Sequence, residues 1–181
     1  SGVTNATSNT FNILGNSNSD IITANGESAT VSSLENTAAP LTSTTGTQVW
    51  LFTIRDGGAS SDADALPTIV NKITLTQNTG NAVQRWDEAI RSADLFNSIG
   101  TRVASAVIYA DSLVFSAAPI ISVADNGRET LSLRISINTS PNASGQNNDG
   151  DDFVFNITNT NEKTASTGSS GFAAFVMANS I

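Results

Sequence analysis

The residues best suited to chemistry in this sequence are aspartates that gather in one loop. Asp56, Asp62 and Asp64 fall within nine residues, and the adjacent Gly57 and Gly58 let the chain turn tightly. Carboxylate oxygens at alternate loop positions are hard ligands of the kind that Ca²⁺ prefers. The spacing differs from that of an EF-hand, and a solvated acidic turn is the alternative interpretation. We predict a weak Ca²⁺ site at Asp56, Asp62 and Asp64, completed by backbone carbonyls.

A second acidic loop, at residues 147–152, contains two more alternating aspartates, Asp149 and Asp151. They are a second candidate pair of Ca²⁺ ligands. This loop also departs from EF-hand spacing, because no Glu stands at the twelfth position. Asp149 followed by Gly150 is by itself a good hairpin turn, so a plain turn is the favoured interpretation here.

Catalysis needs groups that this chain lacks or does not pair. The chain has no His and no Cys, which excludes a histidine triad, a cysteine nucleophile and a zinc site built on these ligands. Two pairs of carboxylates are adjacent in sequence, Asp87 with Glu88 and Asp151 with Asp152. Adjacent side chains point in different directions and do not flank a sugar as a glycosidase requires. We therefore predict that the protein is not an enzyme.

Composition narrows the partners and the location. The net charge is −8, which disfavours a nucleic-acid partner and an anionic membrane surface. No apolar run is long enough to span a bilayer, so we expect no membrane insertion. The chain has 24 Ser, 22 Thr and 20 Asn, a composition typical of secreted bacterial β-rich modules. It begins at Ser1 without Met, which leads us to expect a processed product that lies outside the cell or on its surface.

The elements that must position the acidic loops are mostly strands. Runs with alternating apolar residues are separated by turn signals, and clear examples are 49–55, 69–76 and 130–137. This pattern predicts an all-β fold, an antiparallel Ig-like β-sandwich, over residues 48–181. Residues 1–47 are polar and form either edge strands, which we expect near 11–14 and 20–24, or a donor or linker segment.

Residues 82–93 are the one segment with a helical period. Its apolar residues are spaced by three, four and three positions, which predicts a short amphipathic helix: Val83, Trp86, Ile90 and Ala93. Asn81 is the expected N-cap, and Asp87 and Glu88 are expected to pair with Arg91. Trp86 lies on the apolar face of this helix and Trp50 on that of a strand, so both are predicted to be buried.

The most specific motif of the chain is FTIRDGG at 52–58, followed by DADALPT at 62–68. Together with the strands that follow, it resembles the repeated β-sandwich modules of very large cell-surface adhesins in Bacteroidetes. The resemblance covers about residues 48–178. It implies a non-catalytic extracellular unit, exported by the type IX system and serving gliding or attachment as an adhesive or spacer module. Within the given sequence we find one copy of the module and no segment like the sorting domain of such proteins, so we expect a fragment of a larger protein or one unit of a polymer.

Two function classes remain open on the sequence alone. The first is a structural module of a bacterial adhesin or filament, such as a fimbrium, whose partners are copies of itself or neighbouring modules. Head-to-tail contact through strand donation by residues 1–24 is one form of it, and a linker between beads on a string is the other. The second class is a carbohydrate-binding module that takes surface glycans. Its candidate aromatic platforms are Trp50, Trp86 and Tyr109, and all three are predicted to face inward.

Overall fold

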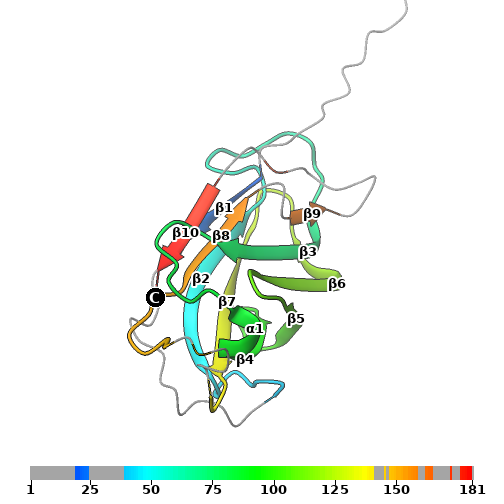
Figure 1. The fold of residues 1–181 in the computed structure, drawn as a ribbon. Helices are drawn as coiled ribbons and strands as arrows, with labels where there is room; N and C mark the ends of the chain where they lie inside the picture. Colours follow the sequence, from blue (N-terminus) through cyan, green and yellow to red (C-terminus); the bar gives the residue numbers. More distant parts are fainter. Residues whose placement is uncertain are drawn as a thin grey trace, which may run out of the picture.

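The computed structural model describes residues 19–24, 39–140, 145, 147–158, 162–164, 172 and 176–180. This part of the chain forms strands joined by turns and one short helix (Figure 1). The elements are β1 (Asp20–Thr23), β2 (Thr47–Arg55), β3 (Thr68–Gln77), α1 (Trp86–Ala89), β4 (Ile90–Phe96), β5 (Arg102–Ile108), β6 (Ser112–Val123), β7 (Arg128–Ile137), β8 (Val154–Thr158), β9 (Glu162–Thr164) and β10 (Val176–Ser180).

The strands follow one hydrogen-bonded order, β1-β2-β7-β4-β5-β6-β3-β8-β10, and β9 pairs with β3. Every pairing between these strands is antiparallel. The sheet curls, so that its first and last strands, β1 and β10, lie side by side (Figure 1), and Ser19 forms an isolated bridge with Phe172. The predicted all-β antiparallel class is confirmed. The finer description as an Ig-like sandwich stays a prediction.

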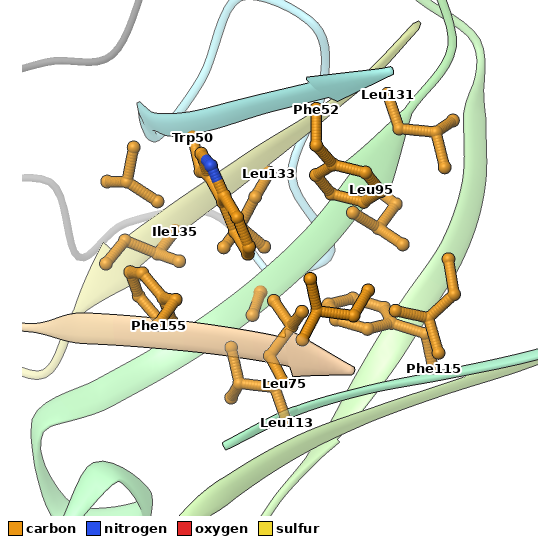
Figure 2. Packing of buried hydrophobic residues seen from close by; sticks show 14 of the residues in the cluster. Trp50, Phe52, Leu75, Leu95, Leu113, Phe115, Leu131, Leu133, Ile135 and Phe155 are labelled. Atoms are coloured by element: carbon orange, nitrogen blue, oxygen red, sulfur yellow. The ribbon is translucent and has the colours of Figure 1, made fainter. Parts of the chain in front are cut away.

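The core lies inside this curled sheet, where the alternating apolar residues of facing strands meet (Figure 2). Trp50 and Phe52 of β2 lie on one side and Phe155 of β8 on the other. The Trp50 and Phe155 rings stack with centroids 6.3 Å apart, and Trp86 packs against Phe155 at 5.0 Å. Both tryptophans are 0% exposed, so their predicted burial is confirmed. Aromatic side chains of this size supply much of the apolar area that stabilises such a core.

The helix predicted over residues 82–93 is present only as α1, from Trp86 to Ala89. The predicted extent was wrong because Ile90 begins β4, which lies between β7 and β5. β7 pairs with β4 from Ile90 to Phe96, β5 pairs with its last three residues, and the Leu41 N–H donates to Asp94. Residues 92–96 are accordingly all buried. Three-and-four spacing of apolar residues therefore does not distinguish a helix from a strand buried on both faces.

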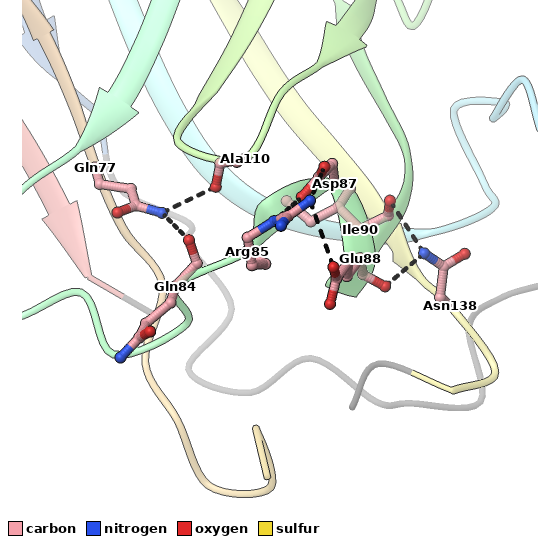
Figure 3. A network of polar contacts seen from close by, with 8 residues as sticks. All are labelled: Gln77, Gln84, Arg85, Asp87, Glu88, Ile90, Ala110 and Asn138. Carbon is pink, nitrogen blue, oxygen red and sulfur yellow. Dashed lines mark hydrogen bonds and ion pairs between the residues drawn. The ribbon is translucent and has the colours of Figure 1, made fainter. Parts of the chain in front are cut away.

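The polar contacts of α1 also differ from those predicted (Figure 3). The N-cap is Arg85 and makes no side-chain cap hydrogen bond, whereas the Asn81 side chain accepts a bond from Trp86 Nε1 at 3.2 Å. Arg85, rather than Arg91, pairs with the two acidic residues, at 2.7 Å from Asp87 and 3.4 Å from Glu88. The Arg85 side chain, just before the helix, thus binds the two acidic residues of the first turn.

Of the two strands expected in the N-terminal segment, the one near 20–24 is found as β1, at the edge of the sheet beside β2. The other, near 11–14, lies outside the described residues. Ile21 is buried, and Asp20 accepts two hydrogen bonds from Arg55, at 2.7 Å from Nε and 2.5 Å from Nη2. The Ser19 hydroxyl lies 2.7 Å from that of Thr68 at the start of β3. The edge-strand interpretation of this segment thus fits residues 19–24.

Candidate metal centre

Two loops meet at one end of the sheet and bring carboxylates together. The first follows β2 and contains Asp56 and Asp62, and the second is the turn between β6 and β7, which contains Asp125. One carboxylate oxygen from each of these three residues lies within 4.8 Å of the other two. We call these three residues the carboxylate cluster. Asp56 and Asp62 were predicted as ligands from the sequence, but Asp125 was not.

Asn126 joins the two loops. Its Oδ1 accepts a hydrogen bond from the Asp62 N–H at 2.7 Å, and its Nδ2 donates to the Asp62 carbonyl at 3.3 Å. Its own N–H donates to Asp56 Oδ1 at 2.8 Å. Asn126 has φ +55°, a left-handed conformation that asparagine adopts more readily than most residues. One asparagine therefore holds both Asp56 and Asp62 in place.

Gly57 provides the space that this contact needs. Its φ is +70°, and a Cβ there would lie 2.9 Å from Asp62 N and 3.0 Å from Asn126 Oδ1. Only glycine takes this backbone conformation without strain and also leaves room for the crossing chain. The glycine after Asp56 is thus required by the geometry of the carboxylate cluster.

The carboxylates of the cluster differ in how well they are satisfied. Asp56 is 3% exposed, and its Oδ2 accepts a hydrogen bond from the Thr68 hydroxyl at 2.6 Å. Asp62 Oδ2 is buried and has no hydrogen-bond partner. The pKa of Asp62 is raised, chiefly by desolvation and then by the negative charges of Asp64, Asp56 and Asp125. A buried carboxylate oxygen without a donor, surrounded by like charges, favours a bound cation or a proton.

The geometry of the cluster fits Ca²⁺. Oxygen ligands bind this ion at 2.3–2.6 Å, so two of them lie at most about 5 Å apart. The separation of up to 4.8 Å in the cluster is within that limit. The nearest basic residue in the sequence, Arg55, is directed to Asp20 instead, as its two hydrogen bonds show. Asp56, Asp62 and Asp125 are therefore the residues that would hold the ion.

Asp64, the third predicted ligand, is not among the three clustered carboxylates. Its Oδ1 accepts a hydrogen bond from Leu66 N at 2.8 Å, and its N–H donates to Asp62 Oδ1 at 3.4 Å. It therefore shapes the loop and adds negative charge beside Asp62. Asp125 was missed because Asp125-Asn126-Gly127 has the sequence of a hairpin turn. Such a turn is present, but it also places a carboxylate opposite the first loop.

The second acidic loop forms turns of its own. The Asp149 N–H donates to Asn147 Oδ1 at 3.2 Å, and the Asp151 N–H donates to the Asn148 carbonyl at 3.2 Å. Neither Asp149 nor Asp151 belongs to a group of metal-ligating side chains among the described residues. The plain-turn interpretation accounts for the described part of this loop.

The aromatic residues weighed as sugar platforms divide into two groups. Trp50 and Trp86 are fully buried, as predicted, so neither offers a face to a ligand. Tyr109 is 51% exposed, and the prediction that it faces inward was wrong. Its N–H donates to the Ser112 carbonyl at 2.8 Å, so Tyr109 closes the tight turn between β5 and β6. The alternation of β5 ends there, and its ring lies at the surface.

Comparisons with known protein families, curated proteins and solved structures found no match to this chain. Within the described residues, no helix has the length and apolar character needed to cross a membrane.

Proposed function

We propose that this protein is a non-catalytic, extracellular structural module of a bacterial surface adhesin or filament, and that Ca²⁺ stabilises it at Asp56, Asp62 and Asp125. The observation that carries the calcium part is the buried Asp62 oxygen without a hydrogen-bond partner, beside two other carboxylates. The surface location rests on composition and on the resemblance to adhesin modules.

A weak calcium site and an extracellular location support each other. Sites in extracellular modules commonly have dissociation constants of about 10⁻⁴–10⁻³ M, which millimolar Ca²⁺ outside a cell fills. A bound ion would join the loop after β2 to the turn between β6 and β7. Since Asp56 also contacts Thr68 at the start of β3, the ion would tie three parts of the sheet together. Such a link suits a module that bears load between neighbours.

The absence of catalysis is part of the proposal, and the surroundings of the acidic residues support it. Asp56 is almost fully buried and already bonded to Thr68 and Asn126, so it is a poor acid or base for a substrate. Asp87 is paired with Arg85, which lowers the pKa of Asp87 mainly through their hydrogen bond. A carboxylate with a lowered pKa is a poor general acid near neutral pH.

Melting of the metal-free and calcium-loaded protein tests the calcium site. We expect millimolar Ca²⁺ to raise the Tm by about 3–6 °C, because it binds the folded state alone. Asp62→Asn and Asp125→Asn should lose this shift. Asp149→Asn, which removes the same charge from the other acidic loop, should keep it. Identical melting curves in EDTA and in millimolar Ca²⁺ would contradict the proposal.

For assembly, we propose that copies join head to tail, with β1 of one subunit completing the sheet of the next. The place of β1 beside β2 has specific contacts for this sequence, namely the burial of Ile21 and the bidentate pair of Asp20 with Arg55. The same strand from a neighbouring copy would meet identical contacts, and main-chain pairing would supply affinity.

Deleting residues 1–24 tests this assembly. The full chain should form multimers whose size rises with concentration in light scattering, and the truncated chain should not. Arg55→Ala in the full chain should weaken assembly in the same direction, because it removes the partner of Asp20. A full chain that stays a monodisperse monomer at high concentration would count against strand donation, as would a truncated chain that still assembles.

A further inference from the structure

A hollow of about 370 Å³ lies on the outer face of the sheet, over β2, β7 and β4. A row of side chains across these strands forms its floor, because Leu51 of β2 and Phe96 of β4 both pair with Ser132 of β7. Gln48 and Thr130 line it on the neighbouring rows. The volume falls at the lower end of the range of about 300–1,000 Å³ typical of small-molecule sites.

One wall of the hollow is the loop at residues 41–46, and it is held at several points. Arg134 donates from Nε to the Thr45 carbonyl at 3.0 Å and from Nη2 to the Gly46 carbonyl at 2.7 Å. Arg102 donates to the Leu41 carbonyl at 3.1 Å. The wall is therefore fixed before any ligand arrives, which reduces the entropy lost on binding.

A second wall is the turn between β4 and β5. Asn97 and Thr101 close this turn, since the Asn97 N–H donates to the Thr101 carbonyl at 2.9 Å and the Thr101 N–H to Asn97 Oδ1 at 2.8 Å. A Cβ on Gly100 would lie 3.3 Å from Ser43 Cβ, so the two walls touch at this point. The hollow is thus bounded by ordered backbone along the 41–46 loop and along this turn.

The lining combines hydroxyl and amide groups with an apolar floor. Ser43, Ser98 and Ser132 supply hydroxyls, Gln48 and Asn97 supply amides, and none of the described lining residues carries a carboxylate. The guanidinium of Arg134 is bonded to two carbonyls and stands opposite Asp94 on β4, and the whole chain carries a charge of −8. An anionic ligand therefore gains little here.

We infer that this hollow binds a neutral saccharide of one or two sugar units. Sugar hydroxyls both donate and accept hydrogen bonds, as do the serine hydroxyls and the amide groups around the hollow. The C–H face of a sugar ring suits a floor that contains Leu51. This binding site goes beyond the structural function proposed above and does not depend on Ca²⁺, so the two proposals can fail separately.

Saturation-transfer NMR on the full chain tests the inference with cellobiose, maltose, lactose and N,N′-diacetylchitobiose as probes. Used at up to about 10 mM, they reveal dissociation constants of about 1 mM. We expect at least one of the four to bind. Ser132→Phe fills the floor and should weaken that binding by roughly tenfold or more. Ser98→Trp blocks the hollow from an exposed turn and should do the same without touching the sheet.

Thr74→Phe is the matched control, because it places the same ring on an outer-face strand position of β3, opposite Val114 and away from the hollow. It should leave binding unchanged, as should Tyr109→Ala. The inference is overturned if none of the four probes binds the folded protein. It is equally overturned if Ser98→Trp binds as the wild type does, or if Tyr109→Ala abolishes binding and thereby moves the site to the surface around that ring.

Discussion

Two aspartates of this protein have buried carboxylate oxygens that are satisfied in opposite ways. Asp94 on β4 is 0% exposed, and it accepts hydrogen bonds from Leu41 N at 2.8 Å, from the Ser92 hydroxyl at 3.2 Å and from the Ser105 hydroxyl. Arg134 lies directly opposite it on β7. Asp62 instead has a buried oxygen with no partner, and its neighbours are other carboxylates.

The difference separates a structural carboxylate from a candidate binding site. Around Asp94, backbone and hydroxyl donors replace water, and the bond to the Leu41 N–H fixes the loop that begins there. Asp62 Oδ2 has no donor, and the negative charges of Asp56 and Asp125 lie close to it, so a bound cation would lower the electrostatic energy of this site. The partners of an acidic residue, rather than its burial alone, therefore indicate whether it is a structural carboxylate or a candidate metal ligand.

The largest effect that this comparison predicts is for Asp94→Ala. The change leaves the Leu41 N–H and two hydroxyls without an acceptor and removes the charge opposite Arg134. We expect the free energy of unfolding, measured with urea, to fall by about 3–4 kcal/mol. Asp149→Ala, at an exposed loop position, should change it by less than about 0.5 kcal/mol. Similar small effects for both variants would show that Asp94 is not a structural anchor.

The next effect tests the packing around the carboxylate cluster through Gly57→Ala. The added methyl group would approach Asp62 N and Asn126 Oδ1, and the backbone has φ +70°. We expect a loss of about 2–3 kcal/mol in unfolding free energy, together with loss of the Ca²⁺-dependent shift in Tm. Gly150→Ala is the control, because φ is +84° there but nothing lies within 4 Å of the added Cβ. It should lose only about 1 kcal/mol. Equal losses would mean that backbone strain alone, without the contact, explains Gly57.

The sequence predicted the parts of this molecule that depend on local patterns. The alternation in β2, β3 and β7 identified their strands and buried faces, and the loop with Asp56 and Asp62 was found from its composition. The sequence did not predict the limits of α1 or the surface position of Tyr109, because both depend on which strands flank a segment. The spacing of residues 90–93 suits a helix, but in the structure β7 pairs with β4 from Ile90 on, and β5 joins β4 from Asp94 on.

Only part of the candidate site could be predicted from the sequence, for the same reason. Asp56 and Asp62 belong to one loop, so their proximity follows from short sequence separation. Asp125 comes from a turn far along the chain, and only the pairing of β2 with β7 brings it near. Asp64 alternates with Asp62 just as a ligand would, yet its carboxylate accepts the Leu66 N–H. Spacing therefore predicted the loop and not the final set of oxygens.

Replacing each of the two aspartates, Asp62 and Asp94, by asparagine in the metal-free protein should change the unfolding free energy by less, and with opposite sign for the two residues. Asp62→Asn removes repulsion from Asp56 and Asp125 and should raise the unfolding free energy by about 1 kcal/mol. Asp94→Asn removes a charge that is fully hydrogen-bonded and should lower it by about 1–3 kcal/mol. Chemical unfolding in EDTA measures both. Destabilisation by Asp62→Asn would contradict the view that this carboxylate lacks compensation.

The smallest effect is the pH dependence of the metal-free protein. The pKa of Asp62 is raised in the folded state, first by desolvation and then by Asp64, Asp56 and Asp125. The folded chain therefore binds this proton more tightly than the unfolded chain, and Asp62 destabilises the protein progressively as pH rises above its ordinary pKa of about 3.9. The side chain in Asp62→Asn does not titrate, so this variant lacks the pH-dependent contribution. The Tm difference between Asp62→Asn and wild type should thus be largest near neutral pH and should shrink as pH falls towards about 4. Thermal melts of both proteins across this range test the sign, and a difference that grows on acidification would show that Asp62 is stabilised as an ion.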